Sequence, residues 1–219
     1  MNWLTLVLLA IFFASVAMLI REGLWSNAIT LFNVITAALL ATNLWEPAAR
    51  WLETSVDKTY RYLWDFLAIW GIFCIAMIVL RTATDFLSRT AVRFKKPVHI
   101  AGGAICAIWV GWVLVCFTTM TLHMAPLAPD FMGGRFQPTP ESRMFFGLAP
   151  DRRWLAFVQK VSRGSLAVSQ AEGEGEPSPR KEDAGLRVFD PVASFIFKYH
   201  QRRVNLDEHL GKTGALRVR

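Results

Sequence analysis

The sequence predicts an all-α membrane protein with about four transmembrane helices and a largely irregular polar C-terminal tail. Two observations predict this class. Long uncharged stretches concentrate in residues 1–123, whereas Pro, Gly and charged residues interrupt residues 124–219 throughout. An apolar helix of about 20 residues is long enough to cross the hydrocarbon layer of a bilayer. Residues 1–123 therefore form the predicted transmembrane domain.

The first two predicted helices form a hairpin. The first covers about residues 2–20, and no Lys or Arg precedes its apolar core. A cleaved signal peptide would start with basic residues and have a shorter core, so we expect this helix to remain in the protein. The second helix covers about residues 24–45. The turn between them, Arg21-Glu22-Gly23, is short enough to require antiparallel packing.

One face of the second predicted helix carries small and polar side chains. In lipid, such side chains favour close helix contacts and interhelical hydrogen bonds. A polar lining for a substrate path is the alternative, but no ionisable residue lies deep in this face. We therefore favour helix packing. The face consists of Ser26, Thr30, Asn33, Ala37 and Ala41, which are spaced three or four residues apart.

The third predicted helix, about residues 63–80, has an acidic residue near its start. The preceding residues 46–62 mix charged and aromatic side chains, as in an interfacial helix or a surface loop. An acidic residue within a span is a functional candidate. Asp65, however, lies one turn from the interface, and Arg61 precedes it by four residues on the same face. We favour an interfacial ion pair between Arg61 and Asp65.

The fourth predicted helix, about residues 98–122, carries a seam of small residues. Gly103, Ala107 and Gly111 are four residues apart, a spacing that lets another helix backbone approach closely. Packing within the chain and dimerisation both explain this seam. The preceding stretch, residues 81–97, is rich in Arg and Lys between apolar residues. It is expected to lie along anionic lipid headgroups.

The tail is expected to contain two short amphipathic helices around a linker. Residues 124–164 form a juxtamembrane segment whose helix, 152–163, either binds a membrane surface or docks on its own protein. Residues 165–186 are rich in Glu, Gly, Ser and Pro and are expected to be disordered. Residues 187–219 contain the second helix.

The second tail helix has a clear start signal. Asp190 suits an N-cap and Pro191 the first helical position. The apolar face that follows must cover a partner, a membrane surface or the first tail helix. That face consists of Val192, Phe195, Ile196 and Tyr199.

No residue pattern in the chain predicts catalysis. We find no motif for hydrolysis, phosphate binding or metal binding, the four histidines are scattered, and the three cysteines lie in apolar spans. The expected protein is therefore not an enzyme and uses no metal or other cofactor. The net charge of +7 suits anionic lipid better than nucleic acid, because several spans accompany it.

The basic loop also bears on orientation. With four spans, both termini lie on one side and residues 81–97 lie on the other. Short loops rich in Lys and Arg prefer the cytoplasm, so the loops alone predict that 81–97 is cytoplasmic and that the termini are outside.

The turn Arg21-Glu22-Gly23, the helix after it and the Gly-bearing fourth helix resemble the colicin V production (CvpA) family of bacterial inner-membrane proteins. Gly102 or Gly103 is similar to the first family glycine of the fourth helix, and Trp109 stands where the family has arginine. The resemblance implies an inner-membrane accessory protein in toxin production, toxin export or envelope homeostasis, with other envelope proteins as partners. The alternative from the residues alone is a homo-oligomeric transporter or channel subunit.

Overall fold

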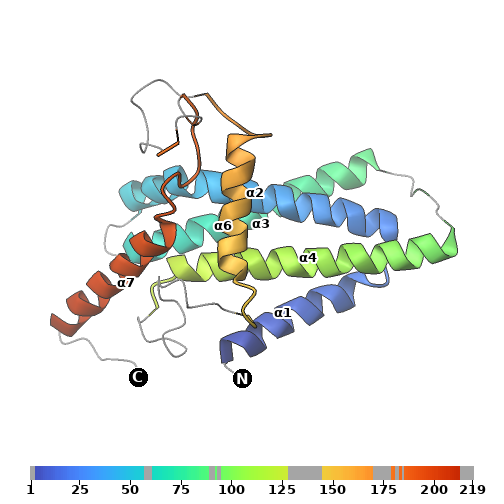
Figure 1. The fold of residues 1–219 in the computed structure, drawn as a ribbon, viewed down its shortest axis with the longest axis horizontal. Helices are drawn as coiled ribbons and strands as arrows, with labels where there is room; N and C mark the ends of the chain where they lie inside the picture. Colours follow the sequence, from blue (N-terminus) through green and yellow to red (C-terminus); the bar gives the residue numbers. More distant parts are fainter. Residues whose placement is uncertain are drawn as a thin grey trace.

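The described part of the chain is entirely helical (Figure 1). Its helices are α1 (Trp3–Leu19), α2 (Leu24–Ser55), α3 (Arg61–Leu87), α4 (Lys96–Met124), α6 (Pro150–Arg163) and α7 (Phe195–Lys212). The computed structural model describes residues 3–56, 61–88, 92, 95–127, 145–169, 179, 180, 183 and 185–212; at 61, 62 and 209–212 it describes the backbone alone. The expected all-α class is confirmed for these residues.

Helices α2, α3 and α4 run side by side along the long axis of the molecule, and α1 packs against α4 (Figure 1). Helix α6 crosses α2 and α4, and α7 lies at the end of the bundle where the C-terminus is found. Of the described helices, α2, α3 and α4 are long and apolar enough to cross a membrane. Helix α1 is apolar but shorter, at 17 residues.

Two helices extend further than the hydropathy pattern predicts. Helix α2 continues from the predicted end near residue 45 to Ser55, with Pro47 inside it. The extension is held because Trp45 and Ala49 are buried in the core on one side of the helix. Helix α3 likewise runs on to Leu87. The expected loop or interfacial segment after residue 45 is therefore largely a continuation of α2.

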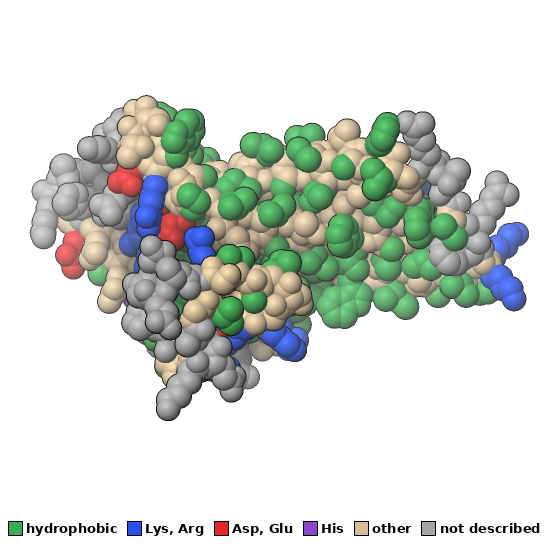
Figure 2. Space-filling view, turned by 90° about the horizontal axis from the view of Figure 1, so that it is seen from above, with side chains coloured by type: hydrophobic (Ala, Val, Ile, Leu, Met, Phe, Trp, Pro, Cys, Tyr) green, Lys and Arg blue, Asp and Glu red, His purple; other side chains and the backbone are tan. Residues whose placement is uncertain are grey.

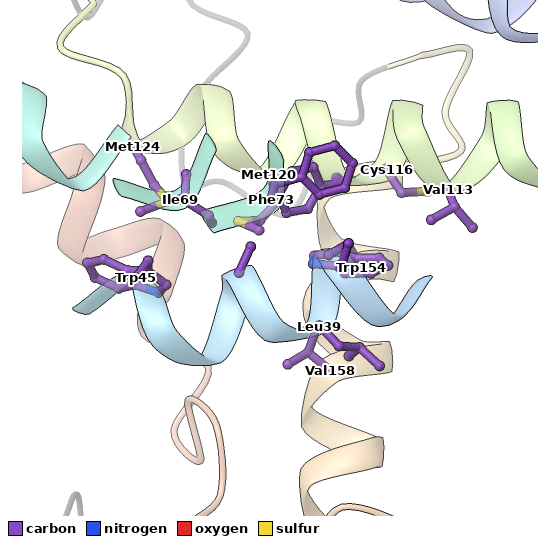
Figure 3. Packing of buried hydrophobic residues seen from close by; sticks show 14 of the residues in the cluster. Leu39, Trp45, Ile69, Phe73, Val113, Cys116, Met120, Met124, Trp154 and Val158 are labelled. Atoms are coloured by element: carbon purple, nitrogen blue, oxygen red, sulfur yellow. The ribbon is translucent and has the colours of Figure 1, made fainter. Parts of the chain in front are cut away.

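The main hydrophobic core lies between α2, α3 and α4 and extends to both tail helices. Figure 3 shows Trp154 of α6 inserted between α2 and α4, beside Cys116 of α4, with Val158 next to Leu39 of α2. The Trp154 ring meets the Phe117 ring edge-on, with centroids 5.8 Å apart. Helix α6 thus docks on its own protein through its apolar side.

The start of α7 differs from the prediction. The Asp190 carboxylate accepts backbone N–H groups from Ser194 at 2.6 Å and Phe195 at 3.1 Å, so it does cap the helix. The helix nevertheless begins at Phe195, because residues 191–193 form a turn first. Val192, expected on the buried face, is consequently exposed.

Much of the predicted linker lies outside the described residues. Its described ends come together in one antiparallel bridge between Ser169 and Leu186. Arg163 at the end of α6 forms an ion pair with Asp183, with 3.0 Å between Nε and Oδ1. These contacts tie the chain after α6 to the chain before α7.

Candidate functional site

The candidate site is a cluster of polar side chains where the two tail helices meet the bundle. We call it the tail junction. It takes side chains from four helices, α3, α4, α6 and α7, and its members are Asp65, His123, Asp151, Tyr199 and Arg202.

Asp65 anchors α7 to α3. Its side chain is buried, with 7% of the residue exposed, and its Oδ2 accepts the Tyr199 hydroxyl at 3.0 Å. The Arg202 guanidinium pairs with the same oxygen. A buried carboxylate is costly without a counter-charge, so Arg202 makes this placement tenable. The side chain of Arg61, the predicted partner, lies outside the described residues.

His123 and Asp151 link the end of α4 to the start of α6. Their Nε2 and Oδ2 atoms are 3.0 Å apart, and both side chains are almost fully buried. Asp151 also lies in the first turn of α6, where a carboxylate interacts favourably with the helix dipole. This contact fixes where α6 begins relative to the bundle.

Tyr199 is the aromatic centre of the junction. Its ring contacts Trp45 of α2 and Phe195 of α7. Burial, followed by the nearby Asp65 charge, raises the pKa of Tyr199 well above its usual value. The hydroxyl therefore stays protonated and acts as a hydrogen-bond donor to Asp65. Burial lowers the pKa of the neighbouring Arg203.

A small cavity adjoins these residues. It is lined in part by His123, Tyr199 and Arg203, and its volume of about 10 Å³ is room for roughly one water molecule. Among the described residues, no group of His, Cys, Asp and Glu is arranged to hold a metal ion. The geometry of the junction is that of a helix-docking site.

The predicted polar face of α2 lies against the C-terminal half of α3. Asn33 Nδ2 donates to Thr84 Oγ1 at 2.9 Å, and the Arg81 guanidinium donates to Thr30 Oγ1 at 3.0 Å. Of the other predicted members of this face, Ala37 and Ala41 are fully buried in the core, whereas Ser26 donates its hydroxyl to the Glu22 carboxylate.

Sequence reasoning missed Asn27, which holds the α1–α2 hairpin against α4. Its buried side-chain amide donates to two carbonyl oxygens, those of Leu19 and Gly103, each at 2.9 Å. The sequence did hold one sign of this contact: Asn27 is an amide side chain in an apolar helix, one helical turn after the loop that joins α1 to α2.

The small-residue seam of α4 is occupied by the same chain. A Cβ atom built on Gly103 would lie 2.9 Å from the backbone carbonyl carbon of Gly23, in the α1–α2 turn. One built on Gly111 would lie 3.1 to 3.2 Å from Phe12 and Val16 of α1. Ala107 between them is fully buried. Gly23 itself has φ +85°, which only glycine adopts without strain.

Charge is distributed unevenly along the molecule. Figure 2 shows apolar side chains over the middle and one half of the bundle, with charged side chains gathered at the end that carries the tail helices and at the opposite tip. Such an apolar belt between two charged ends is the surface expected of a membrane-spanning bundle.

Comparison with known proteins agrees with this arrangement. The family described as Colicin V production protein matches residues 4–145, which include α1 from Leu4 onward and all of α2, α3 and α4, and which end before α6. No curated protein and no solved structure matches the chain significantly. Since the matched region covers more than half of the chain, this multi-pass membrane protein belongs to the colicin V production protein family.

Proposed function

We propose that this protein is a non-enzymatic accessory protein of the bacterial inner membrane that acts in toxin production or export, or in envelope homeostasis. The observation that carries the proposal is the family match, which covers the bundle from Leu4 in α1 to the end of α4. The contacts of the bundle support it, because polar side chains such as Asn33 and Asn27 bind neighbouring helices. These contacts hold α2 to α3 and α4 and use the polar side chains of the bundle for packing.

We infer that α1 is the fourth span. Its 17 residues carry no charge and extend about 26 Å, close to the thickness of the hydrocarbon layer. Several of its apolar side chains, including Phe13 and Met18, are exposed, as they would be against lipid.

The docked tail changes the balance of charge that underlies orientation. The loops alone favoured residues 81–97 on the cytoplasmic side. Helices α6 and α7 now bring further basic residues to the opposite end of the bundle. That end holds eight, because Arg152, Arg153, Lys160, Arg163, Lys198, Arg202 and Arg203 join Arg50 there, against six at the end of the 81–97 loop and the α1–α2 turn. We therefore place the termini and the tail in the cytoplasm. Labelling of single cysteines in intact cells tests this, since a cysteine replacing Val192 should resist membrane-impermeant reagents until the cells are opened.

The accessory role is tested in a strain that makes a secreted peptide toxin and lacks this protein. Secretion should fall and be restored by the full-length chain, and crosslinking in the membrane should capture components of the export apparatus. Purified protein in liposomes should conduct no ions. Ion flux that Asn33→Leu abolishes and Ser26→Ala preserves, with both variants folded, would instead support the oligomeric transporter.

A further inference from the structure

Helix α6 lies at the level where the bundle leaves the membrane. It crosses α2 and α4 (Figure 1), and Trp154 Nε1 donates to Thr42 Oγ1 of α2 at 3.2 Å. The 32 residues of α2 extend about 48 Å, which exceeds the hydrocarbon thickness by about 18 Å. Charged side chains begin one turn beyond Thr42, at Glu46, and continue one turn later at Arg50. Thr42 is therefore close to the membrane boundary.

The apolar surface of the bundle lies on one side of this level. Exposed isoleucines occupy α3 and α4 between α6 and the opposite tip: Ile75, Ile78, Ile100, Ile105 and Ile108. Because these side chains suit lipid, the bilayer must lie on that side of α6. The tail junction lies on the other side, towards the end of α4.

One side of α6 faces the tail junction. Asp151 contacts His123, and the Gln159 amide donates to the Asp190 carbonyl at 2.7 Å. Ser162 Oγ accepts the backbone N–H of Phe189 at 3.1 Å. The one acidic residue of α6 therefore points away from the bilayer.

The opposite side of α6 carries Arg153, Phe157 and Lys160. Their spacings of four and three residues put them on one helix face. The Arg153 guanidinium lies 6.0 Å from the ring centroid of Trp112, one turn from Cys116 in the direction of the exposed isoleucines. Phe157 is 39% exposed, and Lys160 is also exposed. This face therefore looks along the bundle towards the bilayer.

We propose that the α6 face formed by Arg153, Phe157 and Lys160 binds the headgroups of anionic phospholipids. Guanidinium and ammonium groups bind phosphate oxygens, and an aromatic ring between them suits the boundary between headgroups and acyl chains. Long basic side chains on such a helix reach the headgroups while their stems cover apolar surface. The inference goes beyond the accessory role and does not depend on it.

Depth of insertion is tested with the full-length protein in phosphatidylcholine nanodiscs that contain phosphatidylglycerol. After Cys74, Cys106 and Cys116 are replaced by Ser, an environment-sensitive fluorophore is attached to Phe157→Cys. Doxyl-labelled lipid should quench it strongly. The matched control is Phe197→Cys on α7, where the native side chain is 56% exposed and lies outside this face. Equal quenching at both positions, or none at 157, would overturn the proposal.

The charge requirement is tested separately, on the melting temperature in detergent with added phosphatidylglycerol or phosphatidylcholine. Phosphatidylglycerol should raise the melting temperature of the parent protein more than phosphatidylcholine does. Lys160→Gln should reduce this difference, Arg153→Gln combined with Lys160→Gln should abolish it, and Lys198→Gln on α7 should leave it intact. These substitutions change exposed side chains and leave the hydrophobic core intact. If the Lys160→Gln variant and the double variant keep the same difference in melting temperature between the two lipids as the parent protein, headgroup binding is refuted. Toxin secretion is a separate readout, so the accessory role can fail or hold independently.

Discussion

Replacing Trp154 by Ala should release α6 from the bundle. The side chain is 3% exposed and lies between α2 and α4 (Figure 3). Truncating a buried Trp to Ala costs about 3–5 kcal/mol in transfer free energy and cavity formation. The lost hydrogen bond to Thr42 adds about 1 kcal/mol. Loss of this bond does not leave the buried Thr42 hydroxyl without a hydrogen-bond partner, because the hydroxyl still donates to the Ala38 carbonyl at 2.7 Å. The cost therefore stays near about 1 kcal/mol.

Trypsin cleavage within α6 measures this release. Arg153 and Lys160 are cleavage sites that become accessible to the protease when α6 undocks and unwinds. Under conditions where opening is rapid, cleavage follows the population of the open form, and about 1.4 kcal/mol corresponds to a tenfold change. If Trp154→Ala lowers the free energy of docking α6 by about 4 kcal/mol, cleavage should be about a thousandfold faster. The rate cannot exceed the cleavage rate of a fully undocked α6.

Phe157→Ala is the matched control, because it also replaces an aromatic residue of α6 by Ala, and Phe and Trp have similar helix propensities. Phe157 is much more exposed, so in detergent its truncation should cost only about 1–2 kcal/mol. Equal cleavage rates for the two variants, or cleavage of Trp154→Ala no faster than that of the parent protein, would refute the role of Trp154 in docking α6.

Three further predictions concern the hairpin seam and the tail junction. Asp65→Asn removes the carboxylate that binds α7, so amide exchange along α7 should accelerate, by the equivalent of about 1.5–3 kcal/mol. Gly103→Ala puts a methyl group 2.9 Å from the backbone of the α1–α2 turn and should lower stability to chemical denaturation by about 1–3 kcal/mol. Gly71→Ala is the control, because nothing lies within 4 Å of its new Cβ, and it should be neutral or stabilising. Equal losses of stability in the two variants would contradict the close approach of Gly103 to the α1–α2 turn. Burial lowers the pKa of His200 below its usual value of 6.5, and the positive charges of Arg203 and His123 lower it further. The unfolded state therefore binds more protons than the folded state, so α7 should dock less stably as the pH falls below 6.5. Exchange rates of α7 measured against pH should show this, and His200→Gln should flatten the profile.

The sequence predicted the location of the long helices best, because that feature depends only on the amino-acid composition of a stretch as long as one helix. Uncharged stretches predicted helices in the right places, because crossing a bilayer demands about 20 apolar residues whatever their neighbours. Boundaries were less predictable. Pro47 and the charges after residue 45 look like the end of a helix, yet burial of Trp45 and Ala49 continues α2 to Ser55.

The tail junction was beyond local reasoning. Spacing along a helix offers Asp65 a partner four residues away at Arg61, whereas the structure brings it Arg202 from 137 positions later. No periodicity encodes such a contact, since it depends on how α7 docks against α3. Docking of α6 was one of two interpretations of its amphipathic pattern, because an apolar helix face fits a protein surface and a membrane equally well.

The distance between Asp65 and its partners also sets the order in which the molecule can be completed. During synthesis α3 enters the membrane long before α7 has left the ribosome, so the nascent bundle carries a carboxylate without the tyrosine and arginine that will cover it. Only when α7 arrives does this end of α3 become buried. A chain that stalls before Tyr199 would therefore retain, at this end of α3, a carboxylate without the two α7 partners that bind it in the complete molecule.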